Sequence, residues 1–288
     1  MSQFRRVAAP ASAEALNTGR VPPALPDGQP APRDGRLPPA ALADLGEQPF
    51  GVYVHVPFCE ARCGYCDFNT YTASELGPSV SRGSYADTVL LELRLAREVL
   101  RNAVPQVSTV FFGGGTPTVL PAEHLELILH EIADLFGLAP DAEITTEANP
   151  ESVTPAYFAK LRAAGFTRVS IGMQSAVARV LDVLDRRHRP GRPEEAVAEA
   201  HAAGIEHVNL DLIYGTPGES DADWRKSLAA ALAAGPDHIS AYALIVEEGT
   251  ALAARIRRGE VAAPDDDVMA DRYLIGRASC RERVFSSV

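Results

Sequence analysis

The feature that most constrains the fold is a regular alternation of short apolar runs with longer helical segments, which begins at Phe50. The apolar runs that read as strands lie at residues 50–56, 107–112, 142–146, 168–171, 207–213 and 238–246. The segments that read as helices lie at residues 84–104, 121–136, 154–164, 193–203 and 221–234. Gly165, Gly204 and Gly235 follow three of these segments, where helix C-caps belong. Such alternation predicts an α/β fold of parallel βα units joined by right-handed crossovers.

About six βα units are visible, which is too few for a closed eight-fold barrel. Two architectures fit this number: an open, partial parallel β/α barrel, or a doubly wound sheet. In both of them ligands bind at the carboxyl ends of the strands. Motifs that carry chemistry should therefore follow the strands directly.

The first 49 residues differ from the rest of the chain, because they hold nine of the 22 prolines and a single aromatic residue, Phe4. Proline interrupts helices and central strands. The segment also has too little apolar bulk to offset the entropy of ordering it. We therefore expect residues 1–49 to form a disordered, Pro/Ala-rich leader that precedes a core over residues 50–262.

Composition excludes several functional classes. The formal net charge of −11 disfavours sequence-independent binding to nucleic acid, which needs clustered lysine and arginine. The chain has no apolar run long enough for a transmembrane helix and no apolar core of a secretory signal near its first residue. We expect a cytoplasmic protein, in which structural disulfides are rare.

Three of the four cysteines stand close together, in the run Cys59-Glu-Ala-Arg-Cys63-Gly-Tyr-Cys66 that directly follows the first predicted strand. This C-x3-C-x2-C spacing on one short loop points to metal binding in a reducing compartment. Three thiolates on a cubane 4Fe-4S cluster leave one of the four irons without a protein ligand. The alternative is a structural zinc site, which needs four ligands and for which His55 is the candidate fourth.

A second motif, Gly113-Gly-Gly-Thr-Pro117, directly follows the second predicted strand. Consecutive glycines let a ligand approach the main chain closely and leave N–H groups exposed. Taken alone, the motif is more typical of a tight turn. Because the cysteines and the glycines follow neighbouring strands, both motifs should lie on the same rim of the sheet.

The run Tyr53-Val-His-Val-Pro-Phe-Cys59, the cysteine spacing and the Gly-Gly-Gly-Thr-Pro turn together resemble radical S-adenosylmethionine (SAM) proteins. More narrowly, residues 50–274 resemble the oxygen-independent coproporphyrinogen III oxidase family. The resemblance implies a partial barrel, and a 4Fe-4S cluster on Cys59, Cys63 and Cys66 with SAM on the open iron. In such proteins the cluster passes an electron to the SAM sulfonium and yields a 5′-deoxyadenosyl radical.

The same resemblance implies a set of residues that contact the cofactor, and it assigns no catalytic residue. These cofactor-binding residues are Tyr53, Tyr65, Gly114, Gly115, Thr116, Glu147, Gln174, Arg186 and Asp211. Taken singly, Glu147, Gln174 and Asp211 could each be a core polar group or a helix cap. Their common position at the ends of predicted strands favours a ligand instead. Arg186 could equally belong to a solvated charge run with Arg187 and Arg189.

One position separates two branches of the family. The oxidase branch carries a cysteine two residues after the third cluster ligand, where this chain has Phe68. Phenylalanine at this position is similar to HemW-type heme chaperones, which bind heme and hand it to acceptor proteins. The resemblance therefore favours a heme chaperone, with heme as cargo and heme-acceptor proteins as partners, and leaves room for a homodimer. The alternative is the oxidase itself, which acts in porphyrin biosynthesis.

The last residues depart from the family pattern. Family members continue past residue 274 into a smaller C-terminal domain, so we expect residues 263–274 to begin a truncated C-terminal region. Residues 275–284 back-translate to ATC GGA AGA GCG TCG TGT AGG GAA AGA GTG, which reads as a sequencing-library adapter. We therefore expect residues 275–288 to be a non-native tail, in which Cys280 has no role.

Overall fold

Parallel strands and helices alternate from Phe50 onward in the computed structural model, which describes residues 35–38, 42, 45–72, 75, 81–100, 104–279 and 284–287. Its contacts divide the chain into residues 1–36 and residues 37–288, and the fold described below is that of the second unit. The disordered leader expected over residues 1–49 falls mostly outside the described residues.

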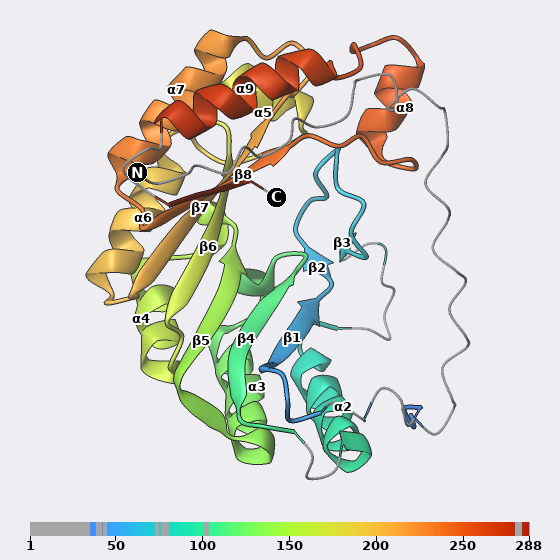
Figure 1. The fold of residues 1–288 in the computed structure, drawn as a ribbon, viewed down its shortest axis with the longest axis vertical. Coiled ribbons are helices and arrows are strands. Elements are labelled where there is room, and N and C mark those ends of the chain that lie inside the picture. Colours follow the sequence, from blue (N-terminus) through green and yellow to red (C-terminus); the bar gives the residue numbers. More distant parts are fainter. Residues whose placement is uncertain are drawn as a thin grey trace, which may run out of the picture. The chain divides into compact units, whose positions relative to one another are not determined.

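A single parallel sheet dominates this unit (Figure 1). Its strands are β1 (Phe50–Val56), β4 (Val107–Gly114), β5 (Leu138–Ala148), β6 (Arg168–Gln174), β7 (His207–Tyr214), β8 (His238–Ala243) and β9 (Val284–Ser287). They pair in exactly this spatial order, β1-β4-β5-β6-β7-β8-β9, and every pairing is parallel. Because the order never reverses, the sheet has no switch point of the doubly wound kind. Of the two architectures that six βα units allow, the open, partial barrel implied by the family resemblance is therefore confirmed.

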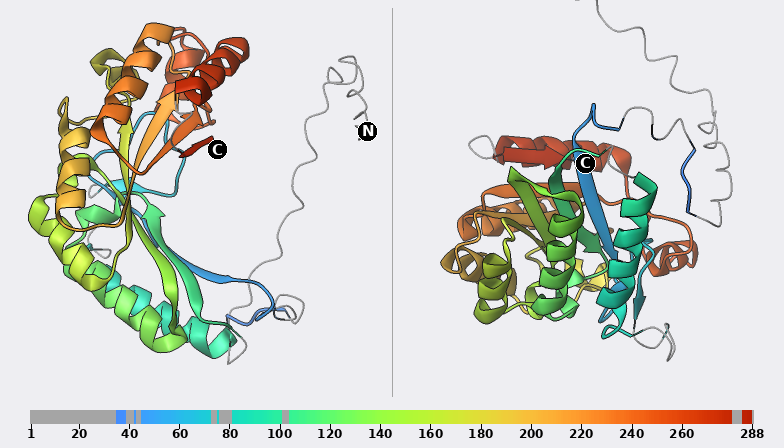
Figure 2. Two further views of the ribbon diagram at one scale, coloured as in Figure 1. Left: turned by 60° about the vertical axis from the view of Figure 1, so that its left-hand side comes forward. Right: turned by 90° about the horizontal axis from the view of Figure 1, so that it is seen from below.

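Helices connect the strands, and most of them pack along one face of the sheet (Figure 2). They are α2 (Tyr85–Leu100), α3 (Ala122–Phe136), α4 (Pro155–Ala164), α5 (Ala178–Val183), α6 (Arg192–Ala202), α7 (Asp221–Ala234), α8 (Ala251–Arg257) and α9 (Asp266–Ser279). Short 3-10 turns lie at η2 (Pro117–Val119) and η3 (Pro150–Ser152), and the pair β2 (Phe58–Cys59) and β3 (Tyr71–Thr72) forms a second, two-stranded sheet.

Capping residues mark the ends of several helices. Ser220 begins α7 with a capping box, in which its side chain and that of Asp223 each bond the other's backbone N–H. Gly165 ends α4 at φ 102° and Gly235 ends α7 at φ 73°, so glycine supplies the left-handed cap at both predicted places. Gly204 has φ 83° and follows the C-cap residue of α6.

The sequence missed several elements. The helices α5, α8 and α9 and the small sheet were not expected, because each is short or lacks a clear apolar stripe. The last predicted strand is three residues shorter than expected and ends at Ala243, whereas β5 extends well beyond residues 142–146 on both sides. The strand β9, in the segment expected to be non-native, pairs residue for residue with His238–Ala241 of β8.

The two faces of the sheet carry different kinds of side chains. Side chains such as Val169, Ile171, Val208 and Leu210 point toward the helices and are fully buried in the main core. Because side chains alternate along a strand, the intervening residues point to the opposite face. That face carries polar and aromatic side chains, and it leads at the carboxyl ends of the strands into the cavity described next.

Candidate functional site

A cavity of about 470 Å³ lies at the carboxyl ends of the strands. All three clustered cysteines line it, and so do eight of the nine residues expected to contact a cofactor. Those eight are Tyr65, Gly114, Gly115, Thr116, Glu147, Gln174, Arg186 and Asp211. The structure therefore brings residues from six separate segments, spread over more than 150 positions of the chain, into one site. Its volume is within the range of pockets that hold small molecules and cofactors, about 300–1,000 Å³.

Tyr53 is the exception, because it does not line this cavity. Its ring stacks beside that of Phe111 and is 57% exposed on the open face of the sheet. Its hydroxyl hydrogen-bonds His55 Nδ1 at 3.2 Å, and His55 Nε2 in turn bonds the backbone oxygen of Asn69 at 2.9 Å. Both ring nitrogens of His55 are thus engaged, which argues against its role as a fourth zinc ligand.

The cysteine loop is held from two sides through Gly64. The backbone N–H of Gly64 donates to the oxygen of Leu184, just after α5, at 2.9 Å. The N–H of Leu252, in the first turn of α8, donates to the oxygen of Gly64 at 2.7 Å. The loop that follows β1, at one edge of the sheet, is therefore tied to segments that follow β6 and β8. These bonds set the backbone of the loop before any metal binds.

The three thiols have few protein partners. Thr116 Oγ1 lies 4.0 Å from Cys59 Sγ, and Arg186 Nη1 lies 3.7 Å from Cys63 Sγ. Burial raises the pKa values of Cys59 and Cys66, while the Thr116 hydroxyl opposes this effect at Cys59. Thiols with raised pKa values and weak partners are poor nucleophiles, so Cys59 and Cys66 are better suited to be deprotonated by metal binding.

The donor set also distinguishes one metal ion from a cluster. Among the residues that the structure describes, no three His, Cys, Asp or Glu side chains converge closely enough to hold a single metal ion. Thiolates around one zinc ion each lie about 2.3 Å from the metal and hence close to one another. In a cubane cluster each thiolate binds a different iron, so the sulfur atoms are spread more widely. Cys59, Cys63 and Cys66 therefore do not form a site for one zinc ion among the described residues.

The glycine turn packs tightly beneath the cysteine loop. The N–H of Gly115 donates to Val56 O at 2.7 Å, and that of Thr116 donates to Phe58 O at 2.8 Å. A Cβ at residue 115 would stand 2.5 Å from Phe58 O, and Gly114 has φ 108°. Both glycines are therefore required by the fold itself as well as by their place in the cavity wall.

The carboxylates of Glu147 and Asp211 both line the cavity and lie near enough to each other to interact. Burial and the nearby charge of Asp211 raise the pKa of Glu147 to about 7, although the N–H of Gly114 donates to Glu147 Oε2 at 3.1 Å. Burial also raises the pKa of Asp211, and hydrogen bonds from Ser170 and Asn209 oppose that rise. Two adjacent buried carboxylates repel each other, so this wall favours a ligand with a cationic group.

Gln174 and Arg186 also line the cavity. Gln174 is one of two non-glycine residues with positive φ, at 63°, in the part of the chain that the structure describes. Such backbone strain concentrates at functional sites. Arg186 Nη2 donates to Gly172 O at 2.8 Å, which directs its guanidinium toward Cys63, while its Nε is buried without a partner. Arg186 thus belongs to the site rather than to a solvated charge run.

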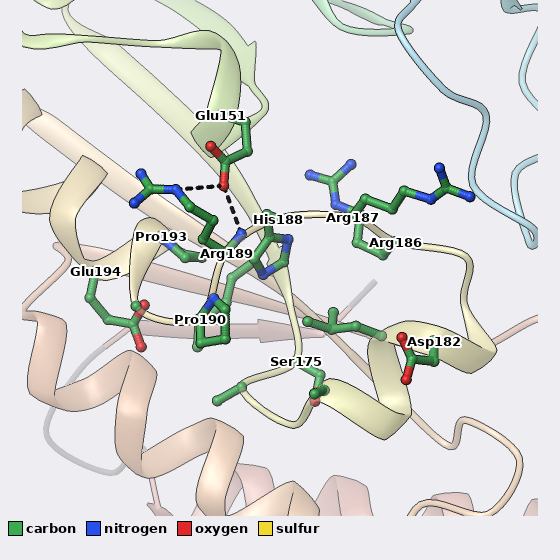
Figure 3. A pocket seen from close by; sticks show the side chains of 15 residues that line it. Glu151, Ser175, Asp182, Arg186, Arg187, His188, Arg189, Pro190, Pro193 and Glu194 are labelled. Atoms are coloured by element: carbon green, nitrogen blue, oxygen red, sulfur yellow. Dashed lines mark hydrogen bonds and ion pairs between the residues drawn. The ribbon is translucent and has the colours of Figure 1, made fainter.

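The neighbouring basic residues face a different cavity, of about 510 Å³ (Figure 3). Arg187, His188 and Arg189 line it, and Arg189 pairs with Glu151, whose Oε1 also accepts from the Arg189 N–H at 2.7 Å. Burial lowers the pKa of His188 to about 4, so this histidine is neutral. The second cavity contains no cysteine and shares only Arg186 with the first.

Sequence reasoning missed several residues of the first cavity. Ser170 and Tyr242 line it, and Asn209 lies buried beneath it. These residues stand inside strand runs, where a lone polar side chain carries no motif. The signal that could have found them is their strand register, since Ser170 pairs with Asn209, and Asp211 pairs with Ser240, on neighbouring strands.

The comparisons with known proteins agree with this geometry. A family model described as "Radical SAM superfamily" matches residues 53–231. The chain is 61% identical to "Heme chaperone HemW" of Mycobacterium tuberculosis (strain H37Rv), over 81% of the chain and 59% of that protein. It is 36% identical to "Radical S-adenosyl methionine domain-containing protein 1, mitochondrial" of Bos taurus, over 83% of the chain and 53% of that protein.

A solved structure of similar fold is coproporphyrinogen III oxidase (HemN) from Escherichia coli, a radical SAM enzyme. It superimposes with a TM-score of 0.74 at 25% identity, over 84% of this chain and 55% of that one. The chain thus spans somewhat more than half the length of the relatives that it matches. None of the helices in the described residues is both long and apolar enough to span a membrane.

Proposed function

Because the chain belongs to the radical SAM superfamily, we propose that it binds a 4Fe-4S cluster and SAM, and that it acts as a heme chaperone. Cys59, Cys63 and Cys66 would hold the cluster, and the two carboxylates, Gln174 and the glycine turn would hold SAM. When bound, a reduced cluster supplies the electron for reductive cleavage of SAM. The chain's own residues bind and orient these groups and restrict the access of water.

The donor set supports the cluster part of this proposal. Three weakly partnered thiols surround one side of a cavity that is large enough for a second ligand. The acidic wall formed by Glu147 and Asp211 lines the same cavity and suits a ligand that carries positive charge, as SAM does. Tyr53 lies outside this cavity, so its proposed contact with the cofactor rests on the resemblance alone.

The observation that carries the chaperone proposal is the 61% identity to a protein named heme chaperone HemW. Phe68 supports it, because this residue stands where the oxidase branch has a cysteine and its side chain is 59% exposed in the cavity wall. The cargo would be heme and the partners heme-acceptor proteins, with a homodimer as the proposed assembly. A second candidate is coproporphyrinogen III oxidation, which the fold similarity to HemN favours.

Anaerobic reconstitution of the full chain with iron and sulfide tests the cluster. We expect about four irons per chain and a brown protein, and loss of all of them in Cys63→Ser. Cys280→Ser is the matched control, because Cys280 is the one cysteine outside the trio, and it should keep its iron. A single zinc per chain, or equal losses in both variants, would contradict the proposal.

The two candidate functions are separated by two assays on the same preparation. A heme titration followed by absorbance should show stoichiometric heme retention. An anaerobic assay with coproporphyrinogen III, SAM and a reductant should yield no protoporphyrinogen. Turnover in the second assay would favour the oxidase instead, whereas failure to retain heme would overturn the chaperone proposal.

A further inference from the structure

A buried polar network lies directly beneath the acidic wall of the cavity. Ser170 on β6 donates through Oγ to Asp211 Oδ2 at 2.8 Å. Asn209 on β7 donates through Nδ2 both to Asp211 Oδ1 at 2.7 Å and to Ser170 Oγ at 2.6 Å. The three side chains therefore form a closed triangle of hydrogen bonds. Asn209 is fully buried and Ser170 nearly so.

The next strand fixes the orientation of Asn209. His238 Nδ1 lies 2.5 Å from Asn209 Oδ1, and Ser240 Oγ donates to the same oxygen at 3.2 Å. With its oxygen accepting from β8, the Asn209 side chain must present its NH₂ group to Ser170 and Asp211. Both amide protons are then used, and the side chain is held from both sides.

The hydrogen bonds of this network act directly on the carboxylate of Asp211. Each of its two carboxylate oxygens accepts one hydrogen bond from the network, so the carboxylate is fixed in position. Hydrogen bonds to the charged form of a carboxylate favour that form and are stronger than neutral ones. The network therefore counteracts the burial that would otherwise neutralise Asp211.

The charged and titratable groups around Asp211 come from three strands. They are Glu147 on β5, Arg168 on β6, and His238 and Tyr242 on β8. Arg168 also pairs with Glu143, at 3.9 Å, near the start of β6 and away from the cysteines. Glu147 accepts a hydrogen bond from the Gly114 N–H, whereas Asp211 has two side-chain donors. Of the two carboxylates, Asp211 is thus the one that two side-chain donors hold in a fixed position.

We propose that Ser170 and Asn209 are positioning residues that hold Asp211 ionised and oriented, and that through Asp211 they determine how tightly the cavity binds SAM. The inference rests on the proposed function, because it takes SAM as the cationic ligand of this wall. Neither residue has to touch the ligand, since both act on the carboxylate. Ser170 lines the cavity beside Asp211, whereas Asn209 lies fully buried beneath it.

The test compares Ser170→Ala with Ser108→Ala in reconstituted protein, by equilibrium dialysis with SAM. Ser108 is the matched control, because its hydroxyl donates to Phe50 O at 3.1 Å near the amino end of β4, away from the cavity. We expect Ser170→Ala to weaken SAM binding on the order of tenfold, the usual effect of one hydrogen bond to a charged group. Ser108→Ala should bind SAM as the wild type does.

Two further measurements separate positioning from a merely structural role. The iron content of Ser170→Ala should stay at the wild-type value, and its SAM affinity should recover as the pH rises, because Asp211 then ionises without help. Ser170→Thr, which keeps a hydroxyl, should restore affinity. Asn209→Ala should weaken binding further, but it also deprives His238 and Ser240 of their acceptor, so its melting temperature is measured alongside.

Wild-type affinity in Ser170→Ala, or an equal loss in Ser108→Ala, would overturn the inference and leave the proposed function standing. A wild-type protein that holds its iron but binds no SAM would overturn the proposed function, and the inference with it. A loss in Ser170→Ala that does not depend on pH and is not restored by threonine would show a packing role only, which also overturns the inference.

Discussion

The carboxylate of Asp185 lies directly against Gly64, the residue between the second cysteine and Tyr65: a Cβ at residue 64 would stand 2.3 Å from Asp185 Oδ2. Asp185 itself has φ 51°, a left-handed conformation that few residues other than glycine adopt readily. It also lies 3.9 Å from Arg255 Nη1 on α8, whose guanidinium donates to Val183 O at 2.9 Å. The geometry of the cysteine loop thus depends on a contact outside the loop.

This contact predicts a pair of compensating substitutions. Gly64→Ala should lower the iron content of the reconstituted protein severalfold, because the new methyl group displaces Asp185 and disturbs both hydrogen bonds of residue 64. Asp185→Gly alone should keep its iron and be slightly more stable, since glycine relieves the left-handed strain.

The double variant Gly64→Ala/Asp185→Gly tests whether the second substitution makes room for the new methyl group at residue 64. It should recover most of the iron that Gly64→Ala loses, as measured by iron analysis and by the cluster absorbance. If the double variant holds no more iron than Gly64→Ala, then glycine at residue 64 serves some purpose other than making room for Asp185.

A second prediction concerns pH. The pKa of Glu147 is raised to about 7 in the folded protein, above its ordinary value near 4.5, so the folded state binds a proton more tightly than the unfolded state. The contribution of Glu147 to the free energy of unfolding should therefore be greatest below pH 4.5 and should fall as the pH rises through about 7. Glu219, whose pKa burial also raises to about 7, adds to the same trend.

Glu147→Gln should remove part of this fall in stability with rising pH. Its melting temperature should exceed that of the wild type by a few degrees near pH 8 and differ little near pH 5, since about 1 kcal/mol corresponds to roughly 2–4 °C in a domain of this size. Thermal melts of the metal-free protein across this pH range provide the measurement. If the melting temperatures of the two proteins differed by the same amount at every pH, Glu147 would not be the source of this pH dependence.

A third prediction concerns the attachment of α9. The side chains of Arg272 and Glu219 are almost fully buried, with Arg272 Nη1 3.3 Å from Glu219 Oε2, and Trp224 Nε1 donates to Arg272 O at 2.9 Å. Removal of one partner leaves a buried charge, which typically costs about 3 kcal/mol or more. Arg272→Ala should therefore be strongly destabilised in urea unfolding, whereas Arg189→Ala, with an exposed ion pair to Glu151, should lose less than about 1 kcal/mol.

The sequence predicted the positions of the six strands along the chain and the rim on which the chemistry lies, because both follow from local patterns. Alternating apolar runs locate the six strands, and the glycines after helices locate the caps. The cysteines and the glycine turn carry recognisable spacing, and the family resemblance located Glu147 and Asp211. The three cysteines, the central residues of the glycine turn and both carboxylates are indeed found in one cavity.

What the sequence could not predict arises from register and from contacts between distant segments. Asn209 and Ser170 become partners of Asp211 only because β6 and β7 pair with Ser170 opposite Asn209. Similarly, the contact of Asp185 with Gly64 joins residues 121 positions apart in the chain through the fold of the linker after α5. Tyr53 matched the family motif, yet the open barrel leaves it outside the cavity.

The last prediction concerns Phe68 and rests on the proposed cargo. Its ring is 59% exposed in the cavity wall, so an apolar planar ligand such as heme could cover it and gain the free energy of burying an aromatic surface. Phe68→Ala should weaken heme binding about tenfold in an absorbance titration, with unchanged iron content. Leu91→Ala is the matched control, because Leu91 is 66% exposed on α2 and does not line the cavity, so its heme affinity should equal that of the wild type. Equal affinities in both variants would place the heme site elsewhere and leave the phenylalanine at this position without a role in cargo binding.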